Sequence, residues 1–190
     1  MHQNAQHPHF FGYGSLVNRA THDHDGGQII TVRGWRRLWA HAPGRDVAFL
    51  TVRPDPDGRI TGLAAPVAAG DWTALDLREA AYTRIPIPTC DILQGPALDD
   101  LAIYAVPQAD LGPASKDAPV LLSYIDVVFQ GYLRETGPKG LAEFIRSTDH
   151  WNAPIKNDRA APIYPRAQTI TAAERDLIDA SLRDLGAAVF

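Results

Sequence analysis

The stretch Phe10-Phe11-Gly12-Tyr13-Gly14-Ser15-Leu16 runs from an apolar, aromatic segment directly into a glycine-rich turn. The apolar start predicts a β-strand over residues 10–14. Because glycines flank Tyr13, the chain can turn sharply there and leave consecutive backbone N–H groups pointing outward. Such a turn can cradle a carboxylate or a developing oxyanion, although an ordinary tight turn has the same composition.

Further strands are expected in the first half of the chain. Apolar runs predict strands over residues 28–33, 36–41, 47–53, 59–67, 85–93 and 101–106. The turn sequence Pro54-Asp55-Pro56-Asp57-Gly58 separates two of these runs and predicts a hairpin. Residues 107–119 are rich in Pro, Gly, Asp and Ala, which is typical of a surface loop or a hinge.

Helices are expected mainly in the last third. The pattern predicts a short helix over residues 72–82 with Asp71 as its N-cap, and longer ones over 120–135 and 141–147. The capping box Thr171-Ala172-Ala173-Glu174 begins a final helix that ends by Gly186. Strands followed by helices indicate an α+β fold, a small mixed β-barrel or curled sheet with flanking helices. We expect one domain over residues 10–190 after a flexible tail of residues 1–9.

Composition excludes several classes of function. The chain has 190 residues, 45% of them hydrophobic and 21% charged, with a net charge of −4. This balance favours neither nucleic acid nor anionic membranes as partners, and the basic residues are scattered. A single cysteine, Cys90, excludes an intrachain disulfide. We find no secretory signal and no apolar run of roughly 20 residues, so the expected location is the cytoplasm. The oligomeric state stays open.

Glu79 is the carboxylate that the pattern singles out. On a helix over residues 72–82 it falls on one face with Trp72, Leu75 and Tyr82. Burial there would raise its pKa and suit it to general acid–base catalysis near neutral pH. Alternatively, Glu79 pairs with Arg84 or Arg78 and only supports the helix.

The glycine-rich turn matches neither of two common catalytic motifs. A dinucleotide-binding fingerprint would need a third glycine at position 17, which is valine. The order Gly12-Tyr13-Gly14-Ser15 is also not that of a nucleophile elbow. Ser15 is therefore interpreted as a hydrogen-bonding hydroxyl rather than a nucleophile.

Taken together, these segments resemble the gamma-glutamylcyclotransferase-like family. Tyr13-Gly14-Ser15 matches the family's strand-borne motif, and Leu75-Asp76-Leu77-Arg78-Glu79, followed by Tyr82 and Arg84, matches its helix motif. The C-terminal part, from residues 123–126 through residues 162–166, resembles the bacterial members. The resemblance spans roughly residues 10–166, and the ordered pair of motifs is fairly specific.

The resemblance implies both a reaction and a site. The α-amino group of a gamma-glutamyl amide would attack its own γ-carbonyl, giving 5-oxoproline and a free amine or amino acid without a cofactor or metal. Glu79 would be the general acid/base, and the backbone of Tyr13, Gly14, Ser15 and Leu16 would bind the gamma-glutamyl group. Tyr104 and Tyr124 resemble family tyrosines that line the pocket, or else are core aromatics with satisfied hydroxyls. Many members have Asn after Tyr-Gly-Ser, whereas this chain has Leu16, with Asn18 two residues on.

Two further groups of residues have side chains that could bind a metal or a substrate. His7-x-His9 and His22-x-His24 have spacings that can chelate a metal, but a polar tail and a solvated loop are favoured for them, together with His2. Residues 152–166 are either a loop over the site, with Lys156, Arg159 or Arg166 facing an acidic substrate, or a structural wrap.

Two other functions remain open beside catalysis. One is a binding module for an anionic gamma-glutamyl-type metabolite without turnover, which the retained Glu79 disfavours. The other is an interaction protein that uses residues 151–164 as its contact surface, which no long amphipathic face or charge run supports.

Overall fold

The computed structural model of the chain describes residues 7–67 and 70–190. Residues 1–6 of the expected tail therefore lie outside the described residues. The first strand, β1 (His9–Gly12), already begins at His9, where the amide donates to the carbonyl of Asp100.

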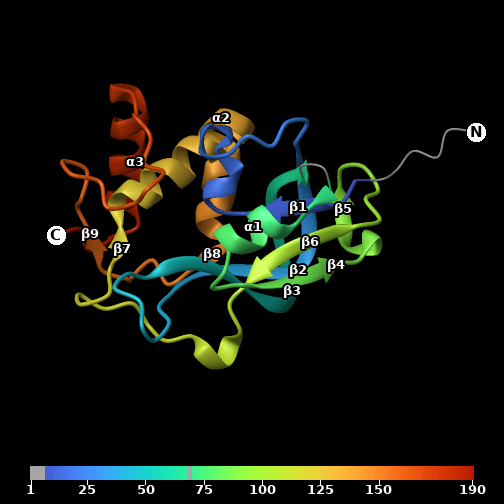
Figure 1. The fold of residues 1–190 in the computed structure, drawn as a ribbon. Helices are drawn as coiled ribbons and strands as arrows, with labels where there is room; N and C mark the ends of the chain where they lie inside the picture. Colours follow the sequence, from blue (N-terminus) through green and yellow to red (C-terminus); the bar gives the residue numbers. More distant parts are fainter. Residues whose placement is uncertain (1–6, 68–69) are drawn as a thin grey trace, which may run out of the picture.

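A curled mixed sheet forms the body of the fold (Figure 1). Its strands follow the order β4-β6-β1-β3-β2-β5, with β8 added to β2. β1 runs antiparallel to β3 and parallel to β6, which makes the sheet mixed. The strand bounds are β2 Gln28–Ala40, β3 Phe49–Pro66, β4 Thr83–Ile87, β5 Ile92–Gln94, β6 Leu101–Ala105 and β8 Thr148–Asp149. The α+β prediction is confirmed.

The predicted hairpin at residues 54–58 is wrong. Pairing of β2 with β3 continues on both sides of this segment, from Trp35 opposite Pro54 to Arg33 opposite Arg59. Residues 54–58 therefore form an irregularity within one long strand, and the chain reverses at residues 41–48 instead. Gly34, with φ of 87°, lies opposite this irregularity on β2 and joins the two strands expected there into one.

In the part of the chain that the structure describes, three α-helices accompany the sheet. The longest, α2 (Leu122–Arg146), covers most of the two helices predicted over residues 120–135 and 141–147, although residues 120–121 form a strand instead. Gly137, whose φ of 68° interrupts the helix just before Pro138, joins the two parts. α3 (Ala172–Asp184) begins at the predicted capping box, in which Thr171 and Glu174 cap each other. β7 (Val120–Leu121) and β9 (Ile155–Lys156) form a small parallel sheet beside α2. No helix in the described ranges has the length and apolar character needed to cross a membrane.

The predicted helix over residues 72–82 is much shorter than expected. α1 (Thr73–Arg78) ends before Glu79, which is its C-cap. Only Leu75 of this helix is buried, and Leu77 is 78% exposed, so there is no second apolar face to extend it. Asp71 accepts hydrogen bonds from the amide and hydroxyl of Thr73, although the N-cap position belongs to Trp72.

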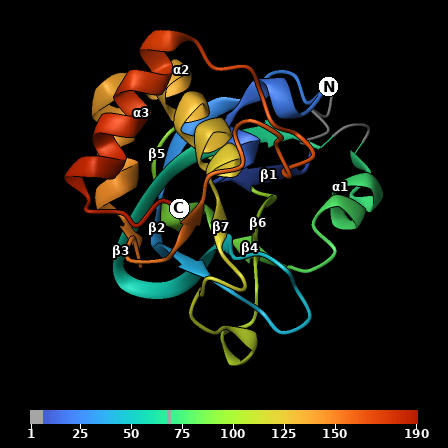
Figure 2. The ribbon, with the colours of Figure 1, turned by 90° about the vertical axis from the view of Figure 1, so that its left-hand side faces the viewer.

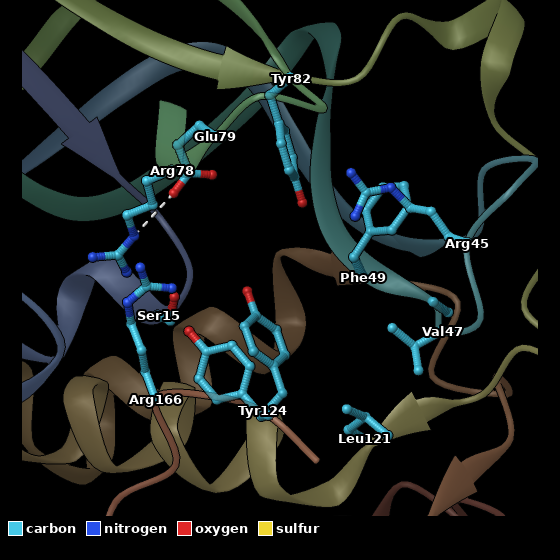
Figure 3. A pocket seen from close by; sticks show the side chains of 12 residues that line it. Ser15, Arg45, Val47, Phe49, Arg78, Glu79, Tyr82, Leu121, Tyr124 and Arg166 are labelled. Atoms are coloured by element: carbon cyan, nitrogen blue, oxygen red, sulfur yellow. Dashed lines mark ion pairs between the residues drawn. The ribbon is translucent and has the colours of Figure 1, made fainter. Parts of the chain in front are cut away.

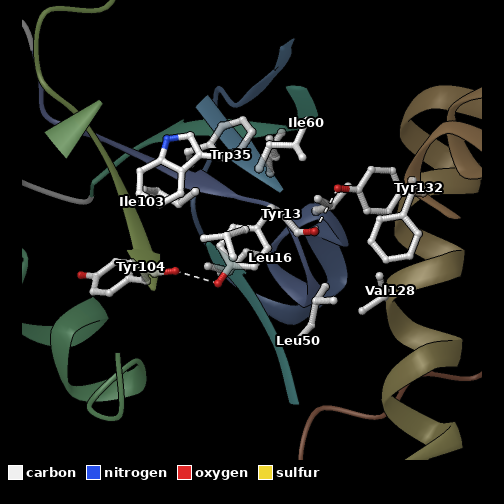
Figure 4. Packing of buried hydrophobic residues seen from close by; sticks show 14 of the residues in the cluster. Tyr13, Leu16, Trp35, Leu50, Ile60, Ile103, Tyr104, Val128 and Tyr132 are labelled. Atoms are coloured by element: carbon white, nitrogen blue, oxygen red, sulfur yellow. Dashed lines mark hydrogen bonds between the residues drawn. The ribbon is translucent and has the colours of Figure 1, made fainter. Parts of the chain in front are cut away.

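The core lies between the curled sheet and α2 (Figure 2). Leu16 and Tyr13, which follow β1, lie between the sheet and Val128 of α2 (Figure 4). Within residues 7–67 and 70–190, short 3-10 turns connect the elements: η1 Ser15–Val17, η2 Arg19–Thr21, η4 Thr89–Asp91 and η5 Gln108–Asp110. The turn after β1 is thus held from both sides by the core, which makes it a rigid wall for a site.

Candidate active site

The turn after β1 needs its two glycines for steric reasons. A Cβ atom on Gly14 would lie 2.7 Å from the Tyr124 hydroxyl oxygen, and one on Gly12 would lie 2.6 Å from the Cβ of Leu16. The Tyr13 hydroxyl donates to the carbonyl of Tyr104 at 2.6 Å, which ties the turn to β6. Each glycine therefore permits a close approach of a neighbouring group to the backbone.

Two adjoining cavities open at this turn. The inner one, of about 40 Å³, is lined by the turn together with Leu50, Glu79 and three tyrosines. The outer one, of about 220 Å³, continues from it. Four residues line both cavities and so mark the boundary between them: Ser15, Glu79, Tyr82 and Tyr124. Figure 3 shows the side chains that line the outer cavity.

The structure brings all seven predicted site residues to the inner cavity. Its walls include Tyr13, Gly14, Ser15, Leu16, Glu79, Tyr104 and Tyr124. They differ in what their polar groups contact. The hydroxyl of Tyr104 donates to Asp76 of α1 at 2.5 Å, and its carbonyl accepts from Tyr13. Tyr104 thus supports the wall, whereas Tyr124 lies in both cavities.

Glu79 combines burial with a neighbouring cation. Its side chain is 18% exposed, and its Oε1 lies 3.2 Å from Nε of Arg78. Burial raises the pKa of the Glu79 carboxyl, while the guanidinium groups of Arg78, Arg166 and Arg45 act in the opposite direction. Glu79 therefore both pairs with Arg78 and lines the cavity. The other partner considered for it, Arg84, pairs with Asp76 instead.

Tyrosine hydroxyls and the partly buried Arg78 lie beside Glu79. Burial raises the pKa values of Tyr82 and Tyr124 well above their ordinary range, so both are hydrogen-bonding phenols at neutral pH. The Tyr82 hydroxyl donates to the carbonyl of Leu50 at 3.0 Å. Nη1 of Arg78 donates to the carbonyl of Thr21, and its Nη2 is buried without a hydrogen-bond partner among the described residues.

Of the three basic candidates in residues 152–166, Arg166 lines the outer cavity. Arg159 instead pairs with Asp126 of α2 and Asp179 of α3, each at 2.7 Å. Lys156 is exposed on β9 and does not line the cavity. Residues 152–166 thus have both predicted roles. Arg159 attaches the segment to α2 and α3, whereas Tyr164 and Arg166 line the outer cavity.

Sequence reasoning missed Arg45 as a residue of the cavity. It lies in the connection between β2 and β3, where its guanidinium is 5.4 Å from the ring centroid of Phe49. An exposed arginine in a loop belongs to no periodic pattern, so no signal in the sequence pointed to it.

His22 lies under the turn rather than in a solvated loop. Its Nδ1 accepts from the amide of His24, so the neutral ring carries its proton on Nε2, which donates to the carbonyl of Leu16 at 3.0 Å. Burial lowers the pKa of His22 to about 4, which keeps this ring neutral at pH 7. No group of three or more potential ligands among the described residues is arranged to hold a metal ion.

Comparisons with known proteins identify the fold. No protein-family model and no curated protein sequence matches the chain. A solved structure named gamma-glutamyl cyclotransferase has a TM-score of 0.58 at 12% identity, covering 91% of this chain and 98% of that one. The uncharacterized protein loc79017 from Homo sapiens gives a TM-score of 0.59 at 12% identity, covering 92% and 99%. YkqA from Bacillus subtilis gives 0.58 at 17% identity, covering 76% of this chain but 54% of that one. The chain therefore has the fold of gamma-glutamyl cyclotransferase-like structures.

Proposed function

We propose that this chain is a gamma-glutamylcyclotransferase-like enzyme, which releases 5-oxoproline and a free amine or amino acid from a gamma-glutamyl amide. The observation that carries the proposal is that Glu79 and the turn at residues 13–16 line one cavity, although 63 to 66 positions separate them in the chain. A buried carboxylate facing a glycine-rich turn fits acid–base chemistry on a small anionic substrate.

The proposed reaction is intramolecular. The α-amino nitrogen of the substrate attacks the γ-carbonyl carbon, forming the ring C–N bond, and the original γ-amide C–N bond breaks. The α-ammonium nitrogen loses two protons in becoming the lactam N–H, and the amide nitrogen gains two in leaving as an ammonium group. Glu79 as carboxylate accepts the first proton, which frees the nitrogen to attack, and donates it to the departing nitrogen; the second proton follows between the same two nitrogens as the tetrahedral intermediate collapses. Atoms and protons balance and no oxidation state changes, so the reaction as written needs no cofactor.

The turn at residues 13–16 is proposed to bind the gamma-glutamyl group and keep it folded for attack. The first N–H groups of the η1 turn, at Ser15 and Leu16, have no acceptor within that turn. Fixed N–H donors of this kind stabilise negative charge that develops on an oxygen. Holding the amine against the carbonyl gives the large rate advantage typical of intramolecular attack.

The rest of the proposed binding site consists of Tyr13, Gly14, Tyr104 and Tyr124. Gly14 lets the substrate and the Tyr124 hydroxyl approach the same stretch of backbone. Tyr13 and Tyr104 fix the shape of the inner cavity through the hydrogen bond between them.

The test is release of 5-oxoproline from a panel of gamma-glutamyl amino acids, gamma-glutamyl amines and glutathione. We expect at least one member to be turned over, and Glu79→Gln to lower that turnover by about 10²–10⁴, the usual value of general acid–base catalysis. Glu143→Gln is the matched control because it makes the same chemical change in an exposed pair with Arg146. It should leave turnover unchanged.

Two results would contradict the proposal. Turnover by Glu79→Gln within a factor of about ten of the wild type would remove Glu79 from proton transfer. No 5-oxoproline from any member of the panel would favour the non-catalytic binding module instead.

A further inference from the structure

The outer cavity has more positive charge than a gamma-glutamyl group can balance. Arg45, Arg78 and Arg166 all line it, against the single carboxylate of Glu79. Glu79 is already paired with Arg78. A gamma-glutamyl group brings one carboxylate and one ammonium group, so its own net charge is zero. The charge of the cavity therefore favours a substrate with a second carboxylate.

The arginines lie at two separate sides of the cavity. Arg78 and Arg166 lie together near Glu79 and Ser15, whereas Arg45 lies across the cavity beside Phe49 and Val47 (Figure 3). The turn that binds the gamma-glutamyl group in the proposed function is on the Ser15 side. Arg45 consequently faces the part of the cavity that remains for the departing group.

Arg45 is held in this position by its own loop. Its backbone carbonyl is hydrogen-bonded to Nε2 of His41 at 2.7 Å, and its guanidinium lies over the ring of Phe49. The side chain is exposed at the mouth of the cavity. No side chain or carbonyl of the described residues forms a hydrogen bond or ion pair with this guanidinium. A guanidinium in this position can bind a planar carboxylate with two parallel hydrogen bonds.

We propose that Arg45 determines specificity by binding the carboxylate of the departing group, so that the preferred substrates are gamma-glutamyl amino acids or peptides rather than gamma-glutamyl amines. The inference rests on the proposed function. The wall beside Arg45 is apolar, through Val47, Phe49 and Leu121. The side chain of the departing amino acid is therefore apolar or small rather than charged.

The experiment compares two substrates that differ only in the carboxylate. Gamma-glutamyl-alanine and gamma-glutamyl-ethylamide share every other atom of the departing group, so the ratio of their kcat/KM values isolates the contribution of that carboxylate. We expect the wild type to prefer gamma-glutamyl-alanine by about tenfold or more, the usual worth of a charge-assisted hydrogen bond. Arg45→Gln should bring the ratio close to one, and Arg45→Lys, which keeps the charge, should retain part of it.

Arg59→Gln is the matched control for the change in charge. Arg59 is an exposed residue of β3 that does not line either cavity. The ratio for Arg59→Gln should equal that of the wild type. A loss of folding in any variant would lower both kcat/KM values together and leave the ratio in place, so the ratio separates recognition from stability.

The outcomes distinguish this inference from the proposed function. Equal turnover of the two substrates by the wild type, or an unchanged ratio in Arg45→Gln, would overturn the inference alone. Absence of 5-oxoproline from both substrates and from the wider panel would overturn the proposed function and this inference with it.

Discussion

Glu79 shows at the scale of one residue how burial and charge oppose each other. Burial is the larger effect and raises the pKa of its carboxyl, while Arg78, Arg166 and Arg45 limit the rise. A carboxyl whose pKa is higher in the folded than in the unfolded protein costs stability when it ionises. That cost is absent below the pKa of the unfolded chain, grows as the pH rises from that pKa to the folded pKa, and is constant above the folded pKa.

We expect the wild type and Glu79→Gln to differ in their free energies of unfolding by an amount that depends on pH. The free energy of unfolding of the wild type, minus that of Glu79→Gln, should fall as the pH rises and become constant above the folded pKa of Glu79. Urea denaturation of both proteins from pH 4 to pH 8 measures this difference, and other titrating groups cancel because both proteins share them. A difference that rises with pH would mean that Arg78 outweighs burial.

At the scale of elements, regular apolar patterns were predictable and interruptions were not. The strand over residues 101–106 and the helix after Thr171 have clear periodicity and a cap, and both were predicted closely. Residues 54–58 have the composition of a hairpin turn, but composition does not distinguish a chain reversal from an irregularity inside a paired strand. That distinction depends on the partner strand, which local sequence does not specify.

Some residues of the candidate site were likewise predictable from the sequence, and others were not. The turn at residues 13–16 and Glu79 were predicted from ordered motifs, and both line the inner cavity. The reason given for the burial of Glu79 was wrong, since it caps a short helix instead of lying in the middle of a long one. Arg45 comes to the cavity only because β2 and β3 are long, so that the loop between them extends over the site. A contact of this kind depends on tertiary packing, so it cannot be predicted from local sequence.

The segment between β9 and α3 is an element whose position depends on one carboxylate. Asp158 accepts hydrogen bonds from the Ser123 amide at 2.8 Å, the Ser123 hydroxyl at 2.6 Å and the Ile163 amide at 2.9 Å. Burial alone would raise the pKa of Asp158, but these hydrogen bonds lower it overall. Tyr164 and Arg166, which follow directly, line the outer cavity. Asp158 therefore fixes a wall of the site to the start of α2.

We expect Asp158→Asn to lower both stability and turnover. The amide group of asparagine would point a donor at groups that are themselves donors, which should cost about 2 kcal/mol of the free energy of unfolding. Asp184→Asn, an exposed change near the end of α3, is the control and should cost almost nothing. Urea denaturation and the 5-oxoproline assay measure the two effects. Wild-type turnover in Asp158→Asn would show that the wall does not depend on this carboxylate.

At the scale of the whole molecule, Arg37 joins the sheet to α2. Its side chain is fully buried and donates to the carbonyls of Tyr13 and Thr61 and to the hydroxyls of Tyr132 and Ser147. The Tyr132 hydroxyl also donates to the carbonyl of Tyr13 (Figure 4). In the described part of the chain, no acidic side chain forms an ion pair with Arg37. Carbonyl and hydroxyl oxygens and the rings of Tyr132 and Phe144, whose centroids lie 5.4 and 4.9 Å from the guanidinium carbon, stabilise this buried charge. One of the carbonyls belongs to the turn that lines the site.

Arg37→Lys should therefore destabilise the whole molecule although it keeps the charge. A lysine ammonium cannot reach four acceptors in a planar arrangement, and each buried acceptor left unpaired costs free energy, for a total of about 3 kcal/mol. The neighbouring Arg36 is the matched control, because it pairs with Asp149 at 2.7 Å near the surface and its side chain is 32% exposed. Arg36→Lys should cost less than about 1 kcal/mol. Urea denaturation of both variants measures their free energies of unfolding. Equal decreases in the two variants would mean that Arg37 contributes no more than a surface ion pair. A decrease confined to Arg37→Lys would show that Arg37 stabilises the turn, the sheet and α2 together.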